Sequence, residues 1–251
     1  MLKTFPPSAE IEELTTGPPT VNSFPSNYSI LLAGPPGVGK LEYFLELVKQ
    51  GLEQGKRIVF VTLDLHPAEV RERAKANGLD LADYEGRTFL FVDCYSAMSN
   101  DRLEHDPRKR MYQVSSFSNL EGIGMAMTKA SNDLKTPVMI FFYTVSTLFL
   151  HNTPQAIAKF IQIVTSRVKT TLGFIAYAVH EGVHDQMTMN LLRSLVDGVI
   201  EARFKEDLAR EIRIHHMRGL RPSTAWGTIG QRIQMTATRA TGSAISRGNG
   251  P

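Results

Sequence analysis

The stretch Ile30-Leu31-Leu32-Ala33-Gly34-Pro35-Pro36-Gly37-Val38-Gly39-Lys40 decides the fold. It begins as an apolar run typical of a buried strand, passes through a Gly- and Pro-rich turn, and leads into a helical pattern that runs to about Gln54. The spacing G-x-x-x-x-G-K in a strand–loop–helix context is typical of a phosphate-binding loop. We expect the loop N–H groups to surround a phosphate and Lys40 to reach the outer phosphates.

The residue after Lys40 departs from this pattern. A Ser or Thr normally follows the lysine, and its hydroxyl binds the magnesium ion that accompanies a nucleotide. Here the position is Leu41, which has no side-chain oxygen. A Gly/Pro turn without a ligand is the simpler alternative, but the complete spacing favours phosphate binding.

Composition indicates an ordinary globular chain. Its 251 residues are 42% hydrophobic and 21% charged, which suits one large α/β domain with a buried core. The formal net charge of +3 permits a nucleic-acid partner without arguing for one. The single cysteine, Cys94, excludes an intramolecular disulfide and is typical of a reducing cytoplasm. Because no apolar run approaches the roughly 20 residues of a membrane span, we expect a cytoplasmic protein without membrane contact.

Strand-like and helix-like segments alternate along most of the chain. Continuous apolar strands separated by helices predict an α/β fold with a mostly parallel, twisted sheet and helices on both faces. The last two strands alternate polar and apolar residues, which predicts an antiparallel C-terminal extension. Expected strands lie at about 30–33, 57–62, 88–92, 138–142, 173–179, 198–203 and 211–217. Expected helices lie at about 40–54, from 67 onward, and at about 120–134, 155–169 and 189–195.

Composition also divides the chain into three parts. Residues 1–26 are rich in Pro, Ser, Thr and Glu, and we expect an extended arm there. Residues 27–235 are expected to form one ATP-binding domain. Residues 236–251 are rich in Gly, Ser and Thr, which predicts a flexible tail.

Several short motifs follow the loop in a fixed order. They read FVTLDLHP at 60–67, FVDCYS at 91–96, VSTL at 145–148, LVDGVIE at 195–201 and HMRG at 216–219. In this order they resemble the KaiC/RadA branch of the RecA-like ATPases over about residues 28–235. The last two motifs are the most telling, because a generic phosphate-binding-loop protein lacks them.

The resemblance implies a single RecA-like P-loop domain that binds ATP or ADP at subunit boundaries and assembles into a ring or a filament. It gives Lys40 the role of the phosphate-binding lysine. The family's pair of water-activating glutamates falls on Asp64-Leu65, so one shorter acid remains. The family's Lys-x-Arg, which reaches the γ-phosphate of the neighbouring subunit, falls on His216-Met217-Arg218, so the arginine is kept and the lysine is lost.

Metal binding is where this sequence departs from the family. The family's magnesium-binding hydroxyl falls on Leu41, and the aspartate that holds magnesium through water falls on Tyr143. We therefore expect phosphate binding to survive while Mg2+ loses both of its anchors. Glu42 and Asp64 are the acids that would have to compensate, and no residue is assigned as a metal ligand.

These observations predict a KaiC-like nucleotide-binding protein that hydrolyses ATP weakly or not at all and serves a regulatory or assembly role with an unidentified protein partner. An active ATPase with Asp64 as base and a DNA-binding recombinase paralogue are the alternatives. The mild net charge does not favour DNA binding, for which Arg108-Lys109-Arg110 would be the candidate segment.

The candidate catalytic residues are Asp64 and Arg218. The candidate nucleotide-binding residues are Gly34, Pro35, Pro36, Gly37, Val38, Gly39, Lys40, Leu41 and His216.

A zinc-peptidase pattern, H-E-x-x-H, also occurs at His180-Glu181-Gly182-Val183-His184. Zinc binding by this pattern requires a helix that places both histidines on one face. Here the pattern directly follows an apolar strand and has a glycine at its centre, which disfavours a helix. We therefore expect a polar loop at the strand end, without zinc. The resemblance to RecA-like ATPases implies that this loop lies near the nucleotide side, where its histidines could still contact a ligand.

Overall fold

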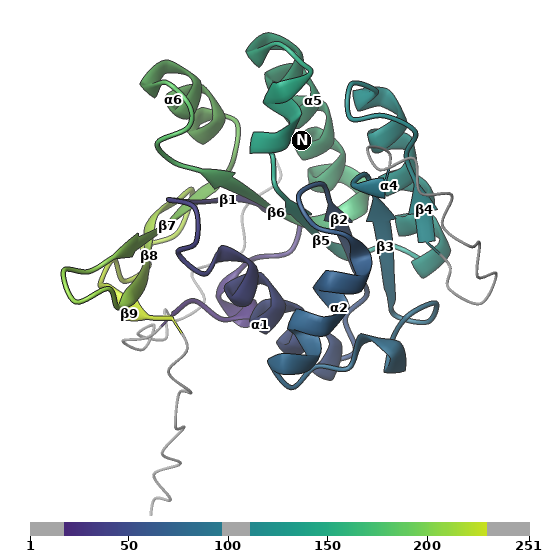
Figure 1. Cartoon of the computed structure of the whole chain (residues 1–251), viewed down its shortest axis with the longest axis horizontal. Helices are drawn as coiled ribbons and strands as arrows, with labels where there is room; N and C mark the ends of the chain where they lie inside the picture. The colour runs from purple at the N-terminus through teal and green to yellow at the C-terminus, as the bar shows by residue number, and fades with distance from the viewer. Residues whose placement is uncertain (1–17, 97–110, 230–251) are drawn as a thin grey trace, which may run out of the picture.

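A computed structural model describes residues 18–96 and 111–229. Its strands, all in one sheet (Figure 1), are β1 Ser29–Gly34, β2 Ile58–Thr62, β3 Phe89–Asp93, β4 Met111–Gln113, β5 Val138–Tyr143, β6 Gly173–His180, β7 Gly198–Phe204, β8 Arg210–Met217 and β9 Gly227–Thr228. Their order across the sheet is β4-β3-β2-β5-β6-β1-β7-β8-β9. Neighbours from β4 to β7 pair in parallel, whereas β7–β8 and β8–β9 are antiparallel.

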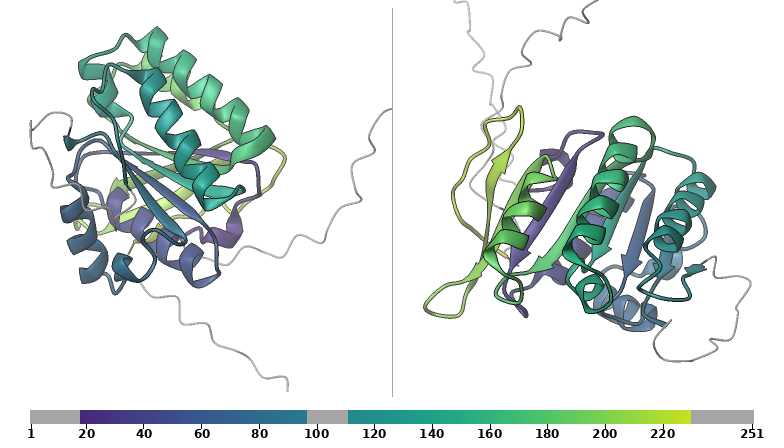
Figure 2. Two further views of the ribbon diagram at one scale, coloured as in Figure 1. Left: turned by 90° about the vertical axis from the view of Figure 1, so that its right-hand side faces the viewer. Right: turned by 90° about the horizontal axis from the view of Figure 1, so that it is seen from above.

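Helices cover both faces of this sheet (Figures 1 and 2). They are α1 Lys40–Glu53, α2 Pro67–Ala76, α4 Leu120–Leu134, α5 Pro154–Arg167 and α6 Gln186–Ser194. Helices α1 and α2 lie on one face, and α4, α5 and α6 lie on the other. Each face buries its own apolar cluster. The predicted α/β architecture, a mostly parallel sheet between two helical layers, is confirmed.

Burial along the strands reflects this layering. Every residue of β2 and β3 is buried, as expected for apolar runs with helices on both sides. In β8, Ile212 and Ile214 are buried and the residues between and before them are more exposed. The alternation arises because only one face of the β7–β8 ribbon packs against the core.

The antiparallel C-terminal extension is confirmed, but it begins one strand later than the sequence suggests. Strand β7 pairs in parallel with β1, with Ile30 opposite Gly198 and Ala33 opposite Glu201. Polar and apolar residues alternate along β7 because one face of this strand is partly exposed, not because β7 runs antiparallel to β1. The short strands β4 and β9 carry no sequence pattern long enough to predict.

The described part of the N-terminal arm packs against the domain. The Val21 N–H donates to Gln50 Oε1 at 3.0 Å, and the rings of Phe24 and Phe174 lie 5.4 Å apart. Val21 lies in a short 3-10 helix, η1 Val21–Ser23. Residues 18–26 therefore lie on the folded body rather than extending from it.

Three predicted features fall outside the described residues. They are most of the N-terminal arm, the Arg108-Lys109-Arg110 segment and the tail 236–251. The predicted domain boundaries stay predictions. Among the residues that the structure describes, no helix is both long enough and apolar enough to span a bilayer.

Candidate functional site

The Gly-rich loop joins the C-terminal end of β1 to the first turn of α1. Gly37 and Gly39 have φ angles of 77° and 94°, a conformation that residues with a Cβ rarely adopt. Lys40 turns back over the loop, and its Nζ donates to the carbonyl oxygens of Gly34 and Pro35, both at 2.7 Å. Lys40 is only 2% exposed. The loop is therefore folded around its own lysine amine.

The environment of Lys40 makes its charge sensitive to a ligand. Burial lowers the pKa of the amine from 10.5 to about 8, and the nearby carboxylates of Glu181 and Asp64 offset part of this shift. A phosphate placed beside the amine would stabilise its charged form and raise the pKa again. Lys40 is thus mostly charged at neutral pH, and an anionic partner would keep it charged at higher pH.

The two positions expected to anchor magnesium do not fit the ion. The Leu41 side chain is 1% exposed and packs in the apolar cluster under α1, so only its backbone N–H is available to a phosphate. Tyr143 ends β5 with its ring edge-on to Phe44, and burial raises the pKa of the phenol above its usual range, so it stays neutral. Among the described residues, no group of three or more His, Cys, Asp or Glu side chains is arranged to hold a metal.

Asp64 lies at the C-terminal edge of the sheet, as predicted, but its carboxylate is already engaged. Thr144 Oγ1 donates to Asp64 Oδ2 at 2.9 Å, and Thr147 Oγ1 donates to Asp64 Oδ1. His180 Nε2 lies 3.3 Å from the same Oδ2. Three protein groups therefore contact the carboxylate, which leaves about one of its four lone-pair sites for a water.

The H-E-x-x-H segment is not helical, which confirms the loop interpretation. His180 ends β6, and Gly182 sits in the following turn with φ 84°. His184 Nε2 lies 2.9 Å from Ser146 Oγ, and burial, aided by the charge of the neighbouring His180, lowers the pKa of His184. The two histidines thus have separate partners within the protein.

Glu181 is a site residue that sequence reasoning missed. Its backbone N–H donates to the Gly34 carbonyl at 3.0 Å, so the turn after β6 contacts the start of the phosphate loop. Its carboxylate forms an ion pair with Arg193 at 2.5 Å. Glu181 could have been recognised only from the order of the strands, because it follows β6, which pairs directly with β1. The sequence alone does not show this order.

Arg218 and His216 lie at the opposite edge of the sheet from the loop of their own subunit. β8 runs antiparallel to β7, with Met217 opposite Gly198 at the start of that strand. Strand β1 spans roughly 17 Å from Ser29 to Gly34 at about 3.3 Å per residue. The sequence-predicted residues therefore divide into a group around Lys40 and a distant pair, His216 and Arg218, which does not reach the loop of its own chain.

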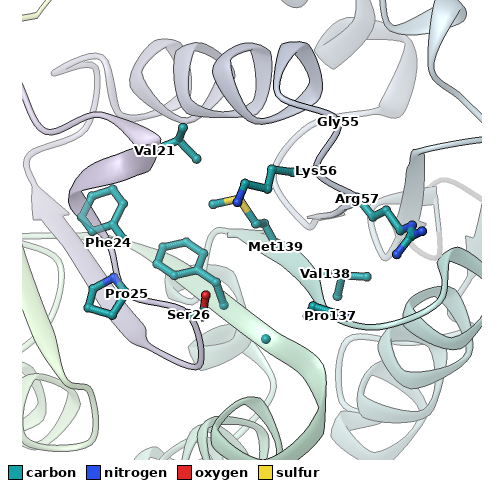
Figure 3. Close-up of a pocket in the computed structure, with 12 residues that line it drawn as sticks. Val21, Phe24, Pro25, Ser26, Gly55, Lys56, Arg57, Pro137, Val138 and Met139 are labelled. Atoms are coloured by element: carbon teal, nitrogen blue, oxygen red, sulfur yellow. The ribbon is translucent and has the colours of Figure 1, made fainter. Parts of the chain in front are cut away.

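A pocket of about 240 Å³ lies at that far edge as well (Figure 3). Phe24 and Phe174 form its apolar wall, and Lys56 and Arg57 contribute cationic side chains. It opens at the N-terminal ends of β5 and β6, whereas phosphate loops lie at the C-terminal ends of parallel strands. This pocket is separate from the candidate nucleotide site.

Comparisons with known proteins agree with this geometry. The family model described as "ATPase: KaiC" matches residues 10–228. A UPF0273 protein from Methanopyrus kandleri is 26% identical over 220 residues, which cover 83% of this chain and 84% of the relative. A UPF0273 protein from Aeropyrum pernix is 25% identical over 224 residues, covering 85% and 88%. The crystal structure of a KaiC-like protein from Pyrococcus horikoshii matches with a TM-score of 0.64 and 18% identity, covering 86% of this chain and 94% of that chain, which shows the shared fold.

Proposed function

The chain belongs to the KaiC family of ATPases, and from this premise we propose that it binds ATP or ADP in the loop between β1 and α1 and hydrolyses ATP weakly or not at all. The observation that carries nucleotide binding is the buried Lys40 amine, held at 2.7 Å from two loop carbonyls beside the N-terminus of α1. Loop N–H groups, the helix dipole and a lysine act together on an anion.

Weak hydrolysis is proposed from two features of the site. Transfer of a phosphoryl group requires charge stabilisation, for which relatives of this fold use a magnesium ion, and Leu41 and Tyr143 offer it no ligand. An attacking water also requires a base, and Asp64 is bonded to Thr144 and Thr147. Both deficits affect the chemical step more than ground-state binding.

The remaining elements of the proposal concern assembly. We propose a ring or filament in which Arg218 of one subunit approaches the nucleotide of the next, and nucleotide occupancy sets assembly or the docking of a protein partner. A cytoplasmic location follows as a prediction from the reduced cysteine and the composition. A gel shift with single-stranded DNA at several salt concentrations tests the recombinase alternative.

Titration with labelled ATP, with magnesium or with EDTA, tests the binding proposal directly. We expect Lys40→Ala to weaken binding by about tenfold or more, because a charge-assisted phosphate contact contributes roughly 1.5–3 kcal/mol. Lys56→Ala removes the same charge at the far edge of the sheet and should leave affinity unchanged. Equal affinity of Lys40→Ala and the wild type would contradict nucleotide binding by this loop. Phosphate release at a few per second would contradict weak hydrolysis.

A further inference from the structure

We infer that Arg210 is a second phosphate-binding cation supplied by the same subunit, and that its guanidinium provides part of the charge that a divalent cation provides in other proteins of this fold. The inference rests on the proposed nucleotide-binding function and adds a residue that the sequence motifs do not contain. Three observations carry it: the position of Arg210 in the sheet, its approach to Gly39, and the absence of an ion pair between Arg210 and any carboxylate of residues 18–96 and 111–229.

Strand register places Arg210 at the phosphate-loop edge of the sheet. A Cβ added to Gly34 would lie 2.6 Å from the Ala202 carbonyl oxygen, so β7 passes directly beside the start of the loop. Ala202 pairs with Ile212 of β8, and Arg210 precedes Ile212 by two residues. Side chains two apart point to the same face of a strand, so Arg210 lies on the α1 side, where Ile212 packs. Figure 1 shows this ribbon beside the loop that leads into α1.

The side chain of Arg210 reaches the last residue of the loop. A Cβ added to Gly39 would lie 3.3 Å from Arg210 Cδ and 3.4 Å from its Nη1. The same point lies 3.8 Å from Glu42 Oε2 in the first turn of α1. The guanidinium is therefore within a few ångströms of the backbone N–H groups that surround a phosphate at a helix N-terminus.

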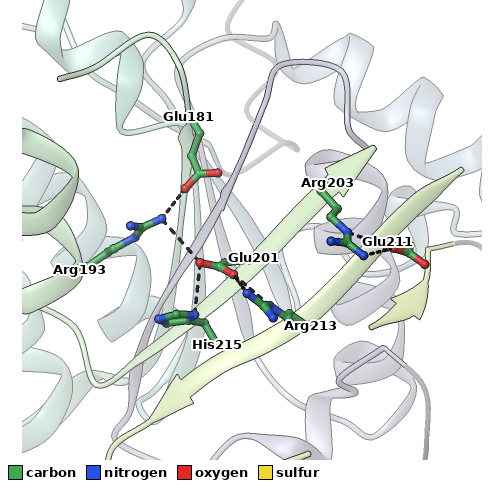
Figure 4. Close-up of polar contacts among 7 residues, drawn as sticks. All are labelled: Glu181, Arg193, Glu201, Arg203, Glu211, Arg213 and His215. Carbon is green, nitrogen blue, oxygen red and sulfur yellow. Dashed lines mark hydrogen bonds and ion pairs between the residues drawn. The ribbon is translucent and has the colours of Figure 1, made fainter. Parts of the chain in front are cut away.

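Nearby arginines on the same ribbon are paired, which sets Arg210 apart. Arg213 forms an ion pair with Glu201 at 2.8 Å, and Arg203 forms one with Glu211 at 2.9 Å (Figure 4). These residues occupy the opposite face of the ribbon, where the Arg203 and Arg213 guanidinium groups also stack on Trp226, at 3.8 Å and 4.5 Å from the ring centroid respectively. Within the described part of the chain, Arg210 forms no ion pair with a carboxylate.

The backbone of Arg210 is fixed while its side chain is exposed. Its carbonyl accepts a hydrogen bond from the Ile229 N–H at 2.8 Å, and β7 pairs with it through Phe204. The side chain can therefore change rotamer without disturbing the sheet. The planar guanidinium can donate two parallel hydrogen bonds to two phosphate oxygens. Unlike a metal ion, it needs no protein ligands to hold it in place. This chemistry agrees with a loop that keeps Lys40 but lacks the magnesium anchors.

Isothermal titration with ATP, ADP and adenosine in EDTA tests the inference on the full-length protein. We expect Arg210→Gln to weaken ATP binding about tenfold or more and to leave adenosine affinity within about twofold. Arg210→Lys keeps the charge but loses the fork, so its ATP affinity should fall between those of Arg210→Gln and the wild type. Lys205→Gln removes the same charge from the same ribbon and should change ATP affinity by less than about twofold, because Lys205 faces Glu211 instead.

The outcomes separate this inference from the proposed function. If the wild type binds ATP, Lys40→Ala weakens binding and Arg210→Gln does not, then the Arg210 inference is wrong and the proposed function stands. Equal losses in Arg210→Gln and Lys205→Gln would also overturn it, because the effect would then be general charge screening. If the folded wild type binds no ATP, both fail together. Circular dichroism of each variant confirms that folding is intact.

Discussion

Arg218 is bound by Asp197 of its own chain, with Nη1 3.2 Å from Oδ1. The same carboxylate oxygen accepts Lys169 Nζ at 2.7 Å, and Ser29 Oγ donates to Oδ2 at 2.8 Å. Asp197 therefore keeps two partners when Arg218 leaves. Asp197, Lys169 and Ser29 can therefore stay in contact while the Arg218 side chain extends toward a neighbouring subunit.

We predict from this arrangement that Arg218→Ala reduces ATP-dependent assembly without unfolding the subunit. The substitution removes the cation proposed to contact the next nucleotide and leaves Asp197 paired with Lys169. Light scattering at saturating ATP measures the assembled fraction, and Arg221→Ala is the control for loss of one exposed positive charge. A wild type that stays monomeric under these conditions contradicts the intersubunit role.

A second prediction concerns pH and Lys40. With a pKa of about 8, the amine is about 90% charged at pH 7 and about 10% charged at pH 9, so ATP affinity should fall about tenfold across that range. Lys40→Ala should bind weakly with no such step. A pH-independent affinity in the wild type would contradict a titrating Lys40.

The lowered pKa of Lys40 also affects the stability of the fold. Rising pH is expected to weaken ATP binding, but it should increase the contribution of Lys40 to the free energy of unfolding. The folded-state pKa lies below the ordinary value of 10.5, so between about pH 8 and 10.5 the unfolded chain binds more protons than the folded one. The contribution of Lys40 to the free energy of unfolding should therefore rise with pH through that window. Urea unfolding of the wild type and Lys40→Ala at pH 8 and pH 10 isolates this contribution, and equal pH slopes would contradict it.

Magnesium should add little to ATP affinity, less than about threefold, because no side chain at the two expected positions holds the ion. The double variant Leu41→Thr with Tyr143→Asp should restore a magnesium-linked gain in affinity. It should also lose about 2 kcal/mol of stability or more, because Leu41 fills the core under α1. Strict magnesium dependence of the wild type would point to Glu42 or Asp64 as an anchor.

Asp64→Ala should destabilise the protein by about 1–3 kcal/mol, because it leaves the Thr144 and Thr147 hydroxyls without their acceptor. Asp207→Ala removes an exposed carboxylate and should stay within about 0.5 kcal/mol of the wild type. Urea unfolding measures both. An unchanged stability together with loss of residual phosphate release would instead identify Asp64 as a base.

The sequence predicted the parts of the site that are local in the chain. The strand, loop and helix from Ile30 to Gln54 follow from apolar periodicity and from glycines at positions with positive φ, and the structure agrees. The order of later strand–helix units was also readable, because continuous apolar strands require helices on both faces.

The parts that depend on strand order were beyond the sequence. Asp64 meets Thr144 and His180 only because β2, β5 and β6 lie side by side, and these residues are 80 and 116 positions away in the chain. Glu181 and Arg210 reach the loop for the same reason. Strand β6 lies on one side of β1, and β7 lies on the other side with β8, which begins at Arg210, next to it. A local pattern contains no information about which strands become neighbours.

The two hydrogen bonds from Lys40 to the Gly34 and Pro35 carbonyls have an energetic consequence. An ammonium group has three N–H donors, so two are directed at the loop backbone and the third remains for a phosphate oxygen. A nucleotide that needs a second donor from Lys40 must replace a hydrogen bond to a loop carbonyl with one to phosphate. The free energy that Lys40 contributes to binding is then the difference between these two contacts, not the full value of the new one.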